Sequence, residues 1–233
     1  GSRHGRDRGR ENRRALTSTR GDTASRGVYT ARMMGMGPAS LFILVTNLGL
    51  SLAGLFIAPR IIERCLFRPF EFARGQRRAT IITSGFVHAD MPHLLFNMIA
   101  FWSFGAPLEH RIGTPLFALL YAAGLLVSQI GTYRKHRNNP DYATLGASGA
   151  VSAVMFAYIV YSPTSKLMML FFPVPVPAPI FGIAYLAYSI WSARNSRDRI
   201  NHDAHLGGAL AGLAFVAIFD PQAYGRAWSL IAG

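Results

Sequence analysis

The sequence predicts an all-α polytopic membrane protein, a bundle of six transmembrane helices with an interfacial loop between the first two. Of the 233 residues, 51% are hydrophobic and only 15% are charged, whereas about 25% are charged in ordinary soluble domains. The charge is also unevenly distributed, because long uncharged runs recur along the chain. One such run could be a buried helix of a soluble protein, but six in succession indicate a membrane bundle.

Four uncharged runs are long enough to cross a bilayer, which takes about 20 apolar residues in a helix. They are 39–58, 112–133, 142–165 and 167–193. The other two spans are the shorter apolar segments 91–108 and 204–219. The fourth of the long runs contains four alternate prolines from Pro173 to Pro179, which cannot all lie inside one regular helix. We therefore expect this helix to begin near Pro179 or Ile180, after an extended approach.

The chain divides into three parts by composition. Residues 1–38 hold nine of the 24 Lys and Arg and few apolar side chains, which predicts a disordered basic tail. Residues 39–220 form the six-span domain, and 221–233 a short C-terminal tail. Between the first two spans, from Pro59 to Phe86, apolar residues alternate with Arg and Glu, a pattern that suits an element lying in the membrane interface.

The net charge of +13 does not indicate nucleic-acid binding, because no DNA- or RNA-binding motif accompanies it. The basic residues lie in the tail and in the loops between spans, where anionic lipid headgroups attract them. We therefore expect the lipid bilayer as a partner and no nucleic acid. The single cysteine, Cys65, excludes an internal disulfide.

Polar groups in the hydrocarbon region are costly and mark functional hypotheses. Four stand out: His93, Asn97, Ser148 and His205. His93 and Asn97 are four residues apart, so that both lie on one face of a helix.

Ser148 and His205 are each followed by small residues. Gly149, Ala150 and Ala153 form a small face on the fourth span, and Gly208 and Gly212 form a GxxxG on the sixth, which allows close helix approach. If these faces meet, the serine and the histidine stand side by side. That pair is the minimum for a nucleophile and its base, because the imidazole takes the hydroxyl proton and returns it to the leaving amine.

A tetrahedral intermediate also needs fixed donors for its oxyanion, and His93, the Asn97 amide and the Ser148 backbone N–H are the candidates. Each residue has a plain structural interpretation as well. Ser148 alone is typical of packing, Asn97 of a helix–helix hydrogen bond, and His205 of a satisfied buried histidine. Their occurrence together favours catalysis.

A metal site is the main rival hypothesis, as in a metal transporter. His202 and His205 form an HxxH, which with His88 and His93 could bind a metal. The spans lack carboxylates or thiolates to complete such a site, and it leaves the small residues around the serine unexplained, so we expect no metal and no cofactor. Asp203 lies two residues before His205, on a different helix face, and is interpreted as the N-terminal cap of the sixth helix or its neighbour.

These motifs resemble the rhomboid family of intramembrane serine proteases, in its basic six-span form. GxSG corresponds to 146–149, AHxxG with the following GxxxG to 204–212, HxxxN to 93–97, and ExR to 109–111. The resemblance covers residues 40–220. It implies a rhomboid-like bundle in which Ser148 is the nucleophile, His205 the base, and His93 and Asn97 part of an oxyanion hole. The implied substrates are the transmembrane segments of single-span membrane proteins.

The resemblance also implies structural roles for a second set of residues: Gly146, Gly149, Gly208, Gly212, Glu109 and Arg111. It implies that the last two stabilise the interfacial segment. Some family members have, four residues after the serine, a tyrosine that packs against the catalytic histidine. Here that residue is Ser152, so the orientation of His205 must come from elsewhere, for example from another aromatic side chain.

Two alternatives remain open at this point. The first is an inactive rhomboid-like protein that holds membrane clients without cutting them, against which the presence of both Ser148 and His205 argues. The second concerns the membrane. We expect a bacterial inner membrane first, and a mitochondrial inner membrane second, because the Arg and Ser content of the tail is typical of a transit segment.

Overall fold

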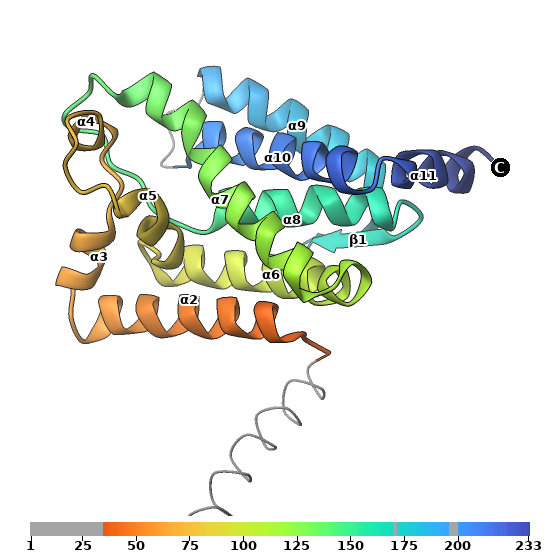
Figure 1. Ribbon diagram of the computed structural model, residues 1–233, viewed down its shortest axis with the longest axis horizontal. Helices are drawn as coiled ribbons and strands as arrows, with labels where there is room; N and C mark the ends of the chain where they lie inside the picture. The colour runs from red at the N-terminus through yellow and green to blue at the C-terminus, as the bar shows by residue number, and fades with distance from the viewer. Residues whose placement is uncertain (1–34, 170–171, 196–199) are drawn as a thin grey trace, which may run out of the picture.

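The computed structural model describes residues 35–169, 172–195 and 200–233, and the expected disordered tail lies outside these residues. The described chain is mostly helical, and its long helices lie side by side (Figure 1). These are α2 (Pro38–Phe56), α6 (Met91–Ile112), α7 (Thr114–His136), α8 (Ser148–Tyr161), α9 (Ala178–Asn195) and α10 (His202–Phe219).

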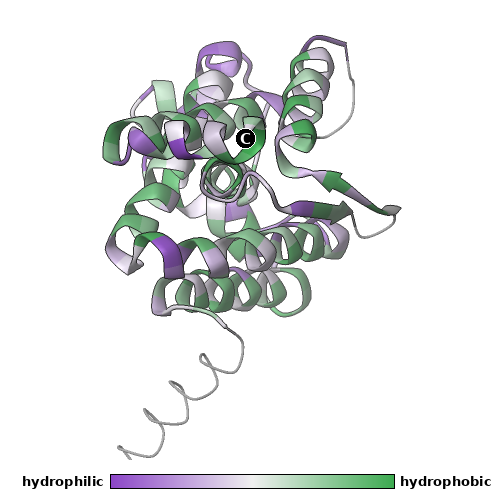
Figure 2. Ribbon diagram, turned by 90° about the vertical axis from the view of Figure 1, so that its right-hand side faces the viewer, coloured by the Kyte–Doolittle hydropathy of each residue, from purple (hydrophilic) through white to green (hydrophobic). Residues whose placement is uncertain are grey.

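Three of these helices, α2, α7 and α10, are long and apolar enough to cross a membrane, and α8 is a shorter apolar helix. Apolar residues run along the outer faces of the helices as well as between them (Figure 2), and side chains such as Phe42, Leu119 and Ile183 are exposed. An apolar exterior is what a bilayer requires. The count of six spans stays a prediction.

Helix α8 forms the centre of the bundle, because only Ser148 and Tyr158 among its 14 residues are not buried. Its small face lies against α10. A Cβ on Gly208 would overlap the carbonyl oxygen of Gly149, and one on Gly212 would overlap that of Ala153. The predicted close approach of the fourth and sixth helices is therefore confirmed.

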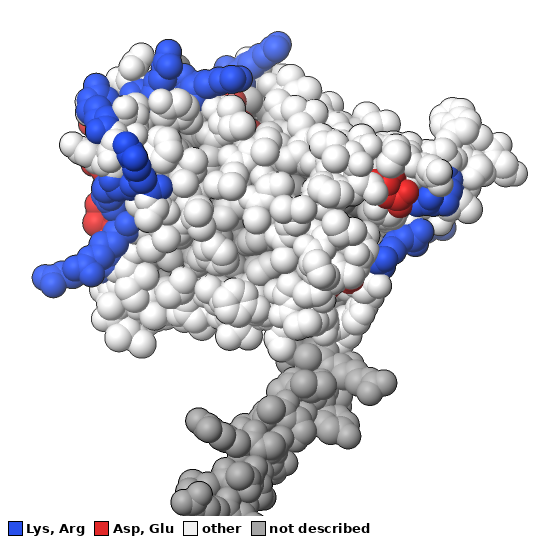
Figure 3. Space-filling model, viewed as in Figure 1, with Lys and Arg blue, Asp and Glu red and all other residues white. Residues whose placement is uncertain are grey.

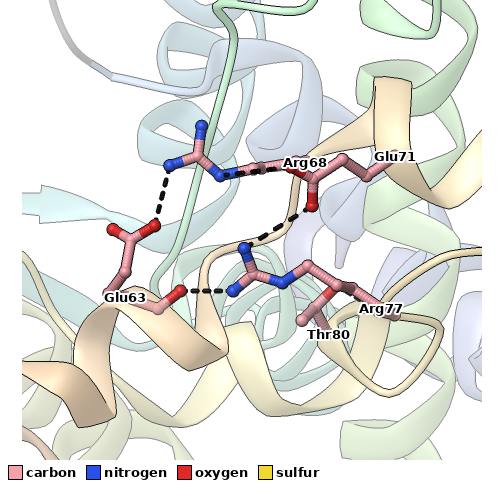
Figure 4. Close-up of polar contacts among 5 residues, drawn as sticks. All are labelled: Glu63, Arg68, Glu71, Arg77 and Thr80. Atoms are coloured by element: carbon pink, nitrogen blue, oxygen red, sulfur yellow. Dashed lines mark hydrogen bonds and ion pairs between the residues drawn. The ribbon is translucent and has the colours of Figure 1, made fainter.

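Short helices connect α2 to α6 at the left end of the molecule in Figure 1. They are α3 (Arg60–Cys65), α4 (Pro69–Ala73), α5 (Thr80–Thr83) and η1 (Ser84–Phe86). Figure 4 shows a polar network among residues on or beside α3, α4 and α5. Arg68 lies 3.0 Å from Glu63 and 4.0 Å from Glu71. Arg77 lies 3.5 Å from Glu71 and donates to the backbone carbonyl of Glu63, and Thr80 donates to the Arg77 carbonyl at 2.6 Å.

Two antiparallel strands precede α9. They are β1 (Lys166–Met169) and β2 (Phe172–Pro177), with Lys166 opposite Pro177. Helix α9 begins directly after β2, at Ala178. The extended approach is therefore confirmed, and the helix begins within two residues of the predicted position.

The segment expected to be a short C-terminal tail forms an additional helix, α11 (Gln222–Ala232). Ala223 and Ala227 are its buried residues, and the Tyr224 hydroxyl donates to the Leu213 carbonyl of α10 at 2.7 Å. The four-residue spacing of the two alanines places both on one face, which packs on the bundle and stabilises the helix.

Candidate active site

The turn that leads into Ser148 is fixed by backbone hydrogen bonds to the segment between α2 and α6. The Phe67 N–H donates to the Thr144 carbonyl at 2.9 Å, and the Thr144 N–H donates to the Phe67 carbonyl at 3.0 Å. The Gly146 N–H donates to the Ser84 carbonyl at 2.9 Å. These bonds explain why α8 begins at Ser148, six residues after the start of the uncharged run.

Gly146 allows this turn for two reasons. Its φ is +117°, a conformation that L side chains rarely adopt. A Cβ there would also lie 2.7 Å from Cε1 and Nε2 of His93. His93, on α6, therefore packs against the residue two positions before Ser148.

His88 links the turn to α2 from the connection between η1 and α6. Its Nδ1 lies 3.0 Å from the Ser51 hydroxyl, and the Ala147 N–H donates to its Nε2 at 3.5 Å. Burial, followed by the charge of neighbouring His93, lowers the pKa of His88 from 6.5 to about 3. A neutral ring donates from one nitrogen and accepts at the other, which fits both contacts.

Asn97 is buried on α6, one turn after His93. Its side-chain nitrogen donates to the His93 carbonyl at 2.9 Å. An amide nitrogen carries two N–H groups, so this bond uses one of them and orients the other. The two residues share a helix face, as their spacing predicts.

Asn201 positions the first turn of α10, which carries His205. Its Oδ1 accepts from the Ala204 N–H at 3.1 Å, and it is the N-cap. Its Nδ2 donates to the hydroxyls of Thr132 at 2.9 Å and Thr144 at 3.2 Å. One side chain therefore ties α7, the turn before Ser148 and the start of α10 together.

The interpretation of Asp203 as the cap or the residue beside it was wrong. The cap is Asn201, and Asp203 lies in the first turn of α10. Its carboxylate pairs with Lys135 of α7 at 2.8 Å. A carboxylate is favourable in the first turn of a helix, and the ion pair with Lys135 gives the Asp203 carboxylate a second stabilising interaction.

Helices α8 and α10 meet at the residues next to Ser148 and His205. A Cβ on Gly149 would lie 3.3 Å from the Ala204 carbonyl oxygen. The residue that follows the serine thus lies against the residue that precedes the histidine. Together with the overlap at Gly208, this contact brings the first turns of the two helices to backbone distance.

Tyr185 of α9 supplies an aromatic partner for His205. The two rings are stacked, with centroids 6.0 Å apart and planes at 25°. The Tyr185 hydroxyl lies 2.7 Å from that of Ser152, the residue four after Ser148. The sequence left the source of the His205 orientation open, with another aromatic side chain as one example, and it does not identify Tyr185, because nothing in it shows which face of α9 meets α10.

Glu109 lies at the opposite end of α6 from His93 and caps α2. Its two oxygens accept from the backbone N–H groups of Ala39 at 3.0 Å and Ser40 at 2.8 Å, and from the Thr114 hydroxyl at 2.8 Å. These contacts are structural, as the resemblance implies, but they join Glu109 to the start of α2 and to Thr114 and not to the interfacial segment. Helix α6 has 22 residues, so that its last turn lies roughly 30 Å from its first.

Arg111 lies in the same final stretch of α6. Its guanidinium lies 5.4 Å from the centre of the Tyr161 ring at the end of α8. This contact, too, stabilises the end of the bundle away from Ser148, and the interfacial segment is held instead by its own network (Figure 4).

The four histidines of the rival metal hypothesis lie in two pairs. The rings of His88 and His93 are 4.9 Å apart and those of His202 and His205 5.8 Å apart, both edge to face. Among the described residues, no group of three or more His, Cys, Asp or Glu is placed to bind a metal ion.

Comparison with known proteins identifies the family. The Rhomboid domain family matches residues 75–222. The chain is 31% identical over 195 residues to the RHOMBOID-like protein 12, mitochondrial, of Arabidopsis thaliana, covering 75% of this chain and 58% of that protein. It is 28% identical over 187 residues to the Rhomboid protein 1, mitochondrial, of Saccharomyces cerevisiae, covering 76% and 53%.

A third relative is the human Presenilin-associated rhomboid-like protein, mitochondrial, 28% identical over 185 residues, covering 69% of this chain and 46% of that protein. The chain spans about half the length of these relatives. The match to the Rhomboid domain covers more than half of the chain and includes Ser148 and His205. The chain belongs to the rhomboid family.

Proposed function

We propose that this protein is an intramembrane serine endopeptidase that cleaves transmembrane segments of single-span membrane proteins. Ser148 is the nucleophile and His205 the general base. The observation that supports the proposal is the close approach of Gly149 to Ala204 and Gly208, because these residues adjoin Ser148 and His205 in the first turns of α8 and α10.

The reaction is acyl transfer followed by hydrolysis. The Ser148 hydroxyl oxygen attacks the scissile carbonyl carbon while His205 takes its proton. When the tetrahedral intermediate collapses, the C–N bond breaks and His205 gives the proton to the leaving amine. Water then attacks the acyl ester with His205 again as base, which releases the acid product and restores the serine.

Three groups are proposed to stabilise the oxyanion. The N–H of Ser148 lies in the first turn of α8, where backbone donors have no partner within the helix. Asn97 has a second amide N–H, and the His93 ring lies against Gly146. If Asn97 is part of the oxyanion hole, replacing it with alanine lowers turnover by roughly tenfold to a thousandfold with folding intact.

Substrates with small, helix-breaking residues near the cut fit this site best, because an intact helix keeps its carbonyls in hydrogen bonds. Helix α9 and the strands before it are the candidate lateral gate. The relatives described above are named as mitochondrial, which favours a mitochondrial over a bacterial inner membrane.

The test compares the wild type with Ser148→Ala and His205→Ala, purified in detergent and offered a transmembrane substrate with and without a chelator. We expect both substitutions to abolish cleavage and the chelator to have no effect. Cleavage that survives either substitution would contradict the dyad, and cleavage that the chelator stops would favour the metal hypothesis. A wild-type protein that binds the substrate without cutting it would support the inactive alternative.

A further inference from the structure

We propose that Tyr185 is the positioning residue that holds the His205 ring in its catalytic orientation, and that α9 must therefore lie against α10 when Ser148 reacts. This inference rests on the proposed function. It adds the requirement that α9 be in place during the reaction, because the positioning ring lies on α9, whereas Ser148 and His205 lie on α8 and α10.

The geometry around His205 carries the first step. The Tyr185 ring stacks on the imidazole at a centroid distance of 6.0 Å. The tyrosine is fixed in turn, because its hydroxyl lies 2.7 Å from the buried Ser152 hydroxyl of α8. Tyr185 also packs on Phe156 of α8, with ring centroids 5.7 Å apart. The ring that faces the base is thus held by the helix that carries the nucleophile.

A second tyrosine of α9 makes a matching contact. Tyr188 lies edge to face with His202, with ring centroids 5.5 Å apart, and His202 lies edge to face with His205. Two tyrosines three residues apart on α9 therefore meet two histidines three residues apart on α10. These ring contacts form a specific interface between α9 and α10 beside the candidate active site.

Besides Tyr185, α9 contributes Phe181 and Leu186, both partly buried, to the apolar cluster around Phe156. Its buried residues are all small: Ala178, Gly182, Ser189 and Ser192. Large side chains such as Ile183 and Trp191 are 70% and 60% exposed, and in Figure 1 α9 lies at the outer edge of the bundle beside α10. Helix α9 thus has only small side chains fully buried, which favours its displacement by a substrate, and its displacement removes the Tyr185 ring from His205.

The functional consequence is an order of events. Loss of the stacking ring widens the range of orientations open to the His205 imidazole, and a misplacement of about 1 Å costs up to about a hundredfold in rate. A substrate that displaces α9 therefore meets a misaligned base, and cleavage follows only after α9 returns. Substrates that cannot fit with α9 in place are bound but cut slowly.

The experiment uses three variants of the full chain. Tyr185→Leu removes the ring, Tyr185→Phe keeps the ring but not the hydroxyl, and Phe181→Leu is the matched control, since Phe181 packs in the same cluster on α9. The kcat and KM for a transmembrane substrate are measured, together with the rate at which a small fluorophosphonate labels Ser148. Thermal unfolding in detergent confirms that each variant is folded.

We expect Tyr185→Leu to lower kcat and the labelling rate by about tenfold to a hundredfold with KM unchanged. Tyr185→Phe should retain most of both rates, and Phe181→Leu should resemble the wild type. A Tyr185→Leu protein that reacts as fast as the wild type would overturn the inference, and so would an equal loss in Phe181→Leu. If Ser148→Ala still cleaves, the proposed function itself fails, which these variants alone would not show.

Discussion

His88 shows how a single buried side chain can make the fold sensitive to pH. Burial lowers its pKa from 6.5 to about 3, so between these values the unfolded chain binds one proton that the folded chain does not. The stability due to neutral His88 is therefore complete above pH 6.5 and is lost as the pH falls toward 3. The slope is at most about 1.4 kcal/mol per pH unit for one proton.

The measurement is the thermal unfolding midpoint in detergent across this pH window, for the wild type and His88→Gln. We expect the wild type to lose stability more steeply than the variant as the pH falls, because the variant lacks the titrating ring. Equal slopes would show that His88 titrates alike in the folded and unfolded chains.

At the scale of elements, the approach of α8 and α10 gives a prediction about Gly212. A Cβ there would overlap the Ala153 carbonyl oxygen, and backbone atoms on two packed helices have little room to shift. We expect Gly212→Ala to destabilise the fold by about 1–3 kcal/mol, measured by unfolding in detergent. Gly225→Ala on α11 is the control, because nothing lies within 4 Å of a Cβ there. A Gly212→Ala protein as stable as this control would contradict the contact.

The same two helices show how far the sequence predicts the site. Small residues at helical spacing predict the contact between Gly149 and Gly208, because close approach requires them on both partners. The partner of His205 could not be predicted in this way. Tyr185 and His205 are 20 residues apart on different helices, and uniformly apolar helices carry no pattern that fixes their rotation.

Boundaries and partners at helix ends were also hard to predict. The start of α8 depends on the turn at Gly146, whose conformation is set by contacts with distant segments. Glu109 accepts from the first turn of α2, 69 and 70 residues away. Such contacts depend on which helix ends meet, and the sequence of one helix does not determine that.

For the whole molecule, the distribution of charge distinguishes one end of the bundle from the other (Figure 3). Ten of the 13 described Lys and Arg residues lie on or beside α3, α4 and the C-terminal turns of α7 and α9, and we call this part the basic end. Ser148 begins α8 at this same end. Exposed Phe56 and Ile57 lie next to Arg60 there, a combination of apolar and basic side chains that suits a surface of anionic lipid headgroups.

We therefore predict that the basic end recruits anionic lipid. Each basic residue near such a surface contributes about 1 kcal/mol, so Arg60→Gln with Arg64→Gln should weaken the preference for anionic over zwitterionic lipid. The measurement is quenching of tryptophan fluorescence by brominated lipids of each kind, and added salt should reduce the preference as well. Lys166→Gln, at the opposite end, is the control. If the double variant and the control show the same preference for anionic lipid, the prediction is contradicted, and the charges of the basic end serve only to keep the loops in water.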